Sequence, residues 1–191
     1  MFKYSALLLV FLYGVNCQIP YVGQCPNVTV KQNFDLKNYS GIWYLVQATY
    51  TNFLREGKCV KANNTFYSDG SIDIRIDQVN FQTRQKSYIE GYGEVVGAHG
   101  EGDLLLRLYG TTFRDTHVNI LDTDYSSYSV NWICEEQTEE ISKAVIWILT
   151  RSRKPSDKLI QKCLDVLGRN NISTSYLVGI DQEGCHFPFV H

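Results

Sequence analysis

The residue types that most often carry enzyme chemistry are few in this chain and form no recognisable catalytic set. Its four histidines, His99, His117, His186 and His191, lack the short pairings that metal sites usually need. No Cys-x-x-Cys, Gly-x-Ser-x-Gly or phosphate-binding glycine loop occurs. Gly91-Tyr-Gly93 begins like a dinucleotide-binding motif, but the third glycine is misplaced and no helix follows. We therefore expect no catalytic residue, no metal and no catalytic cofactor.

Charge is balanced and scattered along the sequence. Eighteen Lys and Arg against 20 Asp and Glu leave a formal net charge of −2. Without a basic patch, neither nucleic acid nor an anionic membrane surface is expected as a partner. A length of 191 residues favours a single domain with a sizeable core.

The first residues predict secretion. Lys3 precedes an apolar run over residues 6–15, and Cys17 ends a segment suited to cleavage. This order is typical of a signal peptide over residues 1–17, which leaves one domain over 18–191. The apolar run is too short to span a bilayer, and no later segment approaches twenty apolar residues. We expect a secreted, extracellular protein without a membrane span.

Strand-like alternation fills most of the remaining chain. Ile72, Ile74 and Ile76, for example, alternate with charged residues. Residues 18–32, with two prolines, are expected to be irregular. The expected strands span residues 42–50, 59–67, 72–77, 87–96, 103–109, 112–121, 125–135 and 143–151.

The pattern becomes helical only after the eighth strand. Ser156 fits a helix N-cap, an apolar stripe follows over residues 157–167, and Gly168 lies just past its end. A short strand is expected over 173–180. Eight sequential strands and one flanking helix favour an all-β, closed antiparallel up-and-down barrel with the helix packed outside, and a two-sheet sandwich is the alternative. A barrel of this size encloses room for one small ligand.

Three short motifs, in order, resemble the signatures of the lipocalin family. They are Gly41-x-Trp43 at the first strand, Thr123-Asp124-Tyr125 before the seventh, and Arg151 at the end of the eighth. The resemblance implies that these residues meet at the closed end of a barrel, with the arginine packed over the tryptophan, a favourable cation–π arrangement. Within the family, the sequence is most similar to arthropod bilin-binding proteins, followed by apolipoprotein D-like carriers and carotenoid-binding crustacyanins.

Alternation outward from Trp43 and Arg151 predicts which side chains face the interior. Ordinary core packing is the alternative role for each apolar member. The expected ligand-binding residues are Leu45, Ile74, Ile76, Ile89, Arg107, Tyr109, Arg114, Thr116, Val118, Asn131, Ile133, Val145 and Trp147.

The cations in this set bear on the ligand. Arg107, Arg114 and Lys143 fall in inward registers near the mouth, where they either reach solvent or meet an anionic ligand group. The family resemblance implies a small hydrophobic ligand, first a biliverdin-type tetrapyrrole with its propionates at these cations. Alternatives are a fatty acid, sterol, retinoid or carotenoid, or a salivary or defensive lipocalin that acts through its surface and has a filled pocket.

Five cysteines remain after the signal segment, so at most two disulfides can form within one chain. The resemblance implies the pairs Cys25–Cys134 and Cys59–Cys185. Cys163 lies on the apolar stripe of the expected helix and is interpreted as a buried free thiol, with an intermolecular bridge, and hence a homo-oligomer, as the alternative.

Four Asn-x-Ser/Thr sequons suit a secreted chain, at Asn27, Asn38, Asn63 and Asn171. They predict a glycoprotein.

Overall fold

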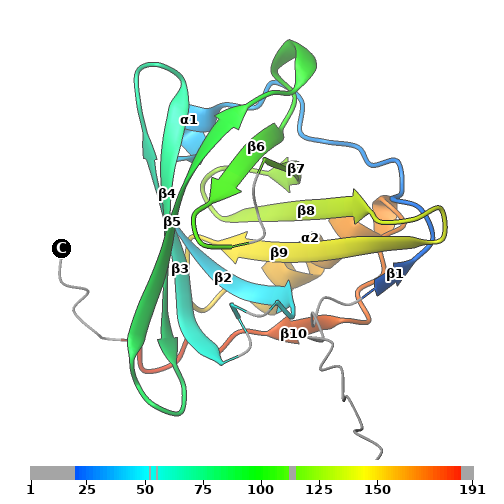
Figure 1. Cartoon of the computed structure of the whole chain (residues 1–191). Coiled ribbons are helices and arrows are strands. Elements are labelled where there is room, and N and C mark those ends of the chain that lie inside the picture. Colours follow the sequence, from blue (N-terminus) through cyan, green and yellow to red (C-terminus); the bar gives the residue numbers. More distant parts are fainter. Residues whose placement is uncertain (1–19, 52, 55, 112–114, 186–191) are drawn as a thin grey trace, which may run out of the picture.

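The computed structural model describes residues 20–51, 53–54, 56–111 and 115–185. In its ring of eight antiparallel strands, each strand pairs with the next in sequence and β9 pairs back with β2 (Figure 1). The predicted closed up-and-down barrel is therefore confirmed. The ring strands are β2 (Gly41–Thr49), β3 (Gly57–Phe66), β4 (Ser71–Asn80), β5 (Lys86–Val95), β6 (Asp103–Leu108), β7 (Thr116–Thr123), β8 (Tyr128–Glu136) and β9 (Ile141–Thr150).

Three short elements flank or interrupt the ring strands. The stretch expected to be irregular contains β1 (Pro20–Val22), which pairs with β9. A proline is tolerated there because it is the first residue of a short added strand. A four-residue helix, α1 (Leu36–Tyr39), precedes β2, and a 3₁₀ turn, η1 (Ala98–Gly100), joins β5 to β6.

The seventh ring strand begins three residues later than expected. Tyr125 has a positive φ of 64°, and Asp124 accepts hydrogen bonds from the backbone N–H groups of Ser126, Ser127 and Tyr128. These contacts form a turn, so β8 starts at Tyr128 rather than at Tyr125.

The barrel wall separates two apolar layers. The inner layer includes Trp43 and the inward residues of the ring strands. The outer layer lies beneath α2 (Asp157–Arg169), whose Val166 and Leu167 pack with Trp132 and Ile148 of the sheet. The single helix flanking the ring was predicted, and it is two residues longer than expected, so Gly168 lies within it rather than just past its end. This helix therefore covers one side of the barrel without entering it.

Cys163 is the free cysteine of the described residues and is fully buried on the face of α2 that packs against the barrel. Burial raises the pKa of its thiol to about 12, so the group stays protonated at neutral pH. The two disulfides are Cys25–Cys134 and Cys59–Cys185, the pairs that the family resemblance implied.

The C-terminal segment (residues 177–185) joins β2 to β3 where these two strands no longer pair. β2 pairs with β3 only over its first four residues, and its last three pair with β10 (Leu177–Gly179). Next, Gln182 Nε2 donates to the carbonyl oxygens of Leu45 on β2 and Val60 on β3, both at 2.8 Å. The segment thus completes the wall along this seam.

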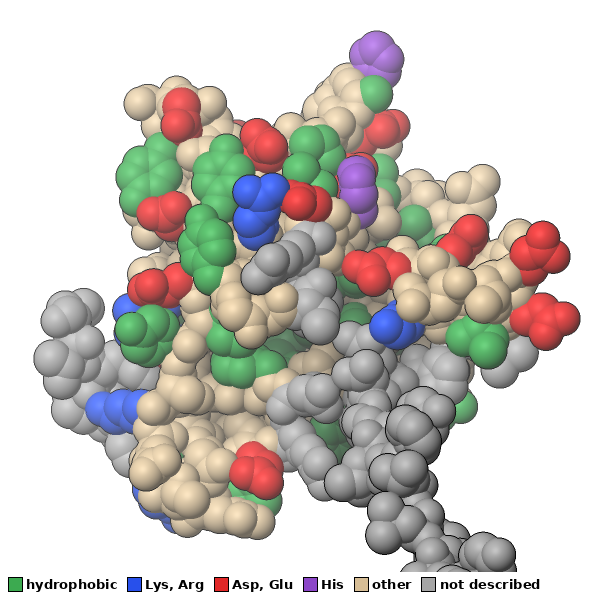
Figure 2. Space-filling model, viewed as in Figure 1, with side chains coloured by type: hydrophobic (Ala, Val, Ile, Leu, Met, Phe, Trp, Pro, Cys, Tyr) green, Lys and Arg blue, Asp and Glu red, His purple; other side chains and the backbone are tan. Residues whose placement is uncertain are grey.

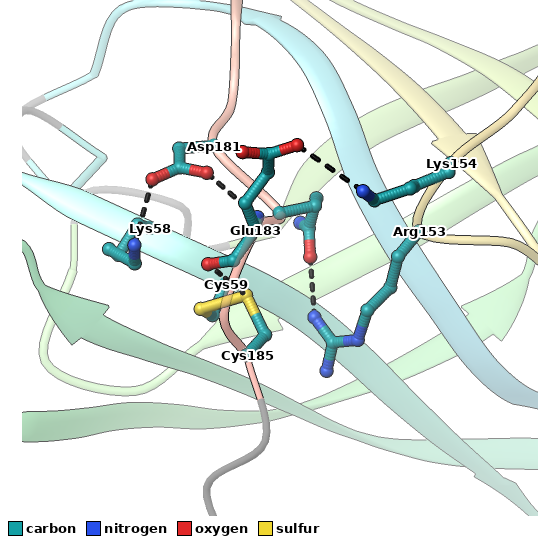
Figure 3. A network of polar contacts seen from close by, with 8 residues as sticks. Lys58, Cys59, Arg153, Lys154, Asp181, Glu183 and Cys185 are labelled. Atoms are coloured by element: carbon teal, nitrogen blue, oxygen red, sulfur yellow. Dashed lines mark hydrogen bonds and ion pairs between the residues drawn. A yellow bond between two sulfur atoms is a disulfide. The ribbon is translucent and has the colours of Figure 1, made fainter.

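Covalent and ionic contacts hold the C-terminal segment in place (Figure 3). The Cys59–Cys185 disulfide ties its end to β3. Lys58 forms an ion pair of 2.8 Å with Asp181, and Lys154 forms one of 3.3 Å with Glu183.

Several predictions fall on residues that the structure does not describe: the signal peptide over 1–17, Arg114, His186 and His191. Among the residues that it does describe, no helix has the length and apolar character needed to cross a membrane.

Candidate functional site

The barrel encloses a cavity of about 710 Å³ with a largely apolar wall. Isoleucines of β4, leucines of β6 and Trp147 of β9 form much of this wall. The volume lies in the range of pockets that hold one small molecule. Within the described part of the chain, no Asp, Glu, Lys, Arg or His lines it. Such a space is suited to an uncharged, mainly apolar ligand.

About half of the expected ligand-binding residues lie in the wall of this cavity. They come from six different ring strands, as expected for a site inside a barrel. These residues are Leu45, Ile74, Ile76, Ile89, Val118, Asn131 and Trp147.

Three other expected residues are buried but do not reach the cavity. Ile133 and Val145 pack in the inner apolar layer, with 2% and 4% of their surface exposed. Thr116 is equally buried, and its Oγ1 donates to Glu135 Oε1 at 3.2 Å. These three residues pack around the wall of the cavity without lining it.

The predicted register of the fifth ring strand, β6, was wrong. Leu104, Leu106 and Leu108 face the cavity, so Arg107 points outward. There Arg107 pairs with Asp115, and Tyr109, just past the strand, is 60% exposed. Neither residue can contact a ligand inside the barrel.

The outer face of the barrel holds the charges that the cavity lacks. Acidic, basic and hydrophobic side chains are interspersed over this surface (Figure 2). Arg75 of β4 pairs with Glu90 of β5 at 3.0 Å and stacks 3.9 Å from the ring centre of Tyr88. Exposed contacts of this kind contribute little to stability.

The parts of the wall that the sequence analysis missed include a strand and a loop. One is β3, which contributes Val60, Ala62 and Asn64; their period-2 spacing was the available signal, but only the valine is strongly apolar. The other is the loop between β2 and β3, where Phe53 and Leu54 turn inward. Two apolar residues in an otherwise polar loop were a weak hint of this.

The loop residues are held by β4. Gln78 Nε2 donates to the carbonyl oxygen of Phe53 at 2.9 Å, and Asn80 Nδ2 donates to Glu56 Oε2 at 2.8 Å. Leu54 is only 5% exposed as a result. This loop therefore forms part of the cavity wall.

The polar residues of the cavity wall include one hydrogen-bonded network and one residue separate from it. Tyr39 Oη accepts from Asn131 Nδ2 at 3.0 Å and lies 3.1 Å from Ser129 Oγ. Burial raises the pKa of the Tyr39 hydroxyl, which therefore stays protonated. Asn64 is the separate residue: its Oδ1 is buried and accepts no hydrogen bond from the part of the chain that the structure describes.

The closed end of the barrel is built around Arg151. Its guanidinium carbon lies 3.6 Å from the ring centre of Trp43. Its N–H groups donate to the carbonyl oxygens of Tyr125, Ile42 and Ser40 at 2.8–2.9 Å. Partial burial lowers the pKa of this arginine, but the group keeps its charge. One side chain thus ties three separate segments together.

The other predicted closing residues shape the chain around this arginine. Gly41 has a φ of +89°, and a Cβ there would lie 3.3 Å from Arg151 Nη1. Thr123 Oγ1 donates to the carbonyl oxygen of Tyr128 at 2.6 Å. For Asp124, burial acts to raise the pKa, but hydrogen bonds from Ser127 hold it below its usual value.

Replacing Arg151 with methionine is expected to lower the free energy of unfolding by about 2–4 kcal/mol, because three backbone carbonyl groups lose their charged donor. Urea denaturation measures this change. Arg107→Met is the control: Arg107 and its partner Asp115 are about half exposed, at 52% and 55%, so its loss should cost about 1 kcal/mol or less. Equal losses for the two variants would contradict the assigned role of Arg151.

All four sequon asparagines are exposed, so glycosylation stays a prediction for each. Asn38 differs from the others because its Nδ2, the atom that a glycan would join, donates to Asp35 Oδ2 at 2.8 Å.

Comparison with known proteins agrees with this architecture. Apolipoprotein D of Cavia porcellus is 27% identical over 183 residues, covering 94% of this chain and 95% of its own. The bilin-binding protein of Pieris brassicae is 27% identical over 150 residues, covering 77% of each chain. The structure of lobster apocrustacyanin A1 superposes with a TM-score of 0.75 at 21% identity, covering 86% of this chain and 92% of that one. The model of the lipocalin / cytosolic fatty-acid binding protein family matches residues 40–184, and the chain belongs to this family.

Proposed function

We propose that this lipocalin is a secreted carrier that holds one uncharged, mainly apolar small molecule inside its barrel. The observation that carries the proposal is the cavity of about 710 Å³, whose described wall has no charged side chain. Two disulfides and the signal-like segment over residues 1–17 support secretion, since disulfides persist in oxidising compartments. The absence of catalysis stays a prediction, as does a homo-oligomer.

A biliverdin-type pigment is the second candidate. The similarity to the bilin-binding protein of Pieris brassicae favours it. Its two propionates, however, would have to lie at the mouth, because Arg107 points away from the cavity and burial of an unpaired carboxylate is costly. A fatty acid meets the same difficulty, whereas a sterol, retinoid or carotenoid does not.

A lipocalin with a filled pocket that acts only through its surface is a weaker candidate. The interior of this barrel retains space for a ligand, and Trp147 faces that space.

Fluorescence of a neutral apolar probe, N-phenyl-1-naphthylamine, tests the proposed function. The probe should brighten on binding and quench tryptophan emission, because Trp147 lies in the wall and Trp43 lies in the inner apolar layer. In Trp147→Phe, part of the quenching should disappear while the probe still brightens. A protein that leaves the probe dark would overturn the proposal.

The pigment candidate has its own test. The protein purified from its native source should absorb red light if it carries a bilin. A colourless protein with an extractable neutral lipid would exclude the bilin and support the uncharged ligand.

A further inference from the structure

The cavity contains a feature that an apolar container does not need. We propose that Asn64 recognises the ligand by accepting a hydrogen bond from a hydroxyl group at its inner end, so that the ligand is an uncharged alcohol. This inference rests on the proposed function and names its ligand class.

The side-chain oxygen of Asn64 is buried and has no hydrogen-bond partner among the described residues. Only 6% of the surface of Asn64 is exposed. A buried amide group that lacks a partner costs about 1–3 kcal/mol. An apolar side chain at this position would avoid that cost, so the asparagine is explained if a bound molecule satisfies it.

The position of Asn64 is deep in the cavity. It pairs with Gly41, the first residue of β2, on one side and with Ile74 of β4 on the other. Gly41 follows Ser40, the C-cap of α1, whose carbonyl oxygen accepts a hydrogen bond from Arg151. The carboxamide therefore lies near the closed end of the barrel, where the inner end of an elongated ligand would rest.

Nearby donors are already engaged. Arg151 donates to backbone carbonyls, and Tyr39 is bound to Ser129 and Asn131. None of these hydrogen bonds involves the side chain of Asn64. The missing donor must then come from the occupant of the cavity.

The charge of the wall restricts the chemistry of that donor. A carboxylate cannot donate, and no cation among the described wall residues would balance it. An ammonium group could donate, but it would be buried without a counter-ion, which is strongly unfavourable. A neutral hydroxyl group meets both conditions.

Three related ligands separate these possibilities: farnesol, its methyl ether and farnesoate, each measured by displacement of N-phenyl-1-naphthylamine. The ether keeps the oxygen but has no hydrogen to donate. We expect the protein to bind farnesol about tenfold more tightly than the ether, and farnesoate more weakly than farnesol. Tighter binding of farnesoate would overturn the inference.

The variant Asn64→Leu should reduce the farnesol-to-ether ratio to about one. Asn63→Leu is the matched control, because Asn63 is the same residue type on the outer face of the same strand. With unglycosylated protein from a bacterial host, this control should keep the tenfold ratio.

Asn64→Ala serves if the leucine variant does not fold, with probe uptake as the check of folding. A ratio that stays at tenfold without Asn64 overturns this inference alone. If the unmodified protein takes up no probe, the proposed function itself fails.

Discussion

Replacing Leu106 with tryptophan should abolish probe uptake, whereas the same replacement at Leu105 should leave it intact. Leu106 faces the cavity and is 4% exposed, so a larger ring at this position occupies the space of the ligand. Leu105 lies on the outer face, between Glu94 of β5 and His117 of β7. A tryptophan at position 106 should overfill the cavity and lower the affinity for the probe on the order of a hundredfold.

This pair of variants also tests the register of β6. If Arg107 faced the interior, Leu105 would share its face and Leu105→Trp would be the variant that blocks binding. Thermal unfolding should confirm that both proteins are folded before titration. Loss of binding in Leu105→Trp with retention in Leu106→Trp would contradict the structure.

Removing the Cys59–Cys185 disulfide should cost about 4–5 kcal/mol of stability and also weaken ligand binding. Its two cysteines are separated by 126 residues, and opening so long a loop restores much entropy to the unfolded chain. The same bond anchors the C-terminal segment, whose Gln182 bridges the wall residues Leu45 and Val60. The double variant Cys59→Ala/Cys185→Ala, unfolded in urea and titrated with probe, measures both effects.

The other disulfide supplies the control. Cys25 and Cys134 are separated by 109 residues, so chain entropy predicts nearly the same loss of stability for Cys25→Ala/Cys134→Ala. That bridge joins the N-terminal segment to β8 and touches no wall residue of the seam. Probe affinity should therefore fall only in the first variant, and an equal fall in both would refute a specific role for the seam.

The sequence by itself determined the barrel and its outer helix. Ile72, Ile74 and Ile76 alternate with charged residues. With this period of two, the isoleucines share one face of the strand, and only that face can turn toward the barrel interior. The helix at 157–169 carried an N-cap serine and an apolar stripe, which are local signals. The lipocalin motifs added the order of the closing residues and the pairing of the cysteines.

Register was harder where local alternation fails. Leu104, Leu105 and Leu106 are consecutive and equally apolar, so the run itself does not reveal which face is buried. The signal lay in the charges: Asp103 and Arg107 share one face, which therefore had to be outside, because an unpaired interior charge is costly.

Only the tertiary structure decided where the polar wall groups and the C-terminal segment lie. Asn64 and its exposed neighbour Asn63 are the same residue type and differ only in the face of the strand on which they lie. That Asn64 Oδ1 lacks a hydrogen-bond donor among the described residues is known only once the surrounding groups are positioned. Gln182 bridges two strands that are more than a hundred residues away in sequence. Such contacts depend on segments brought together by barrel closure, which short-range sequence patterns do not encode.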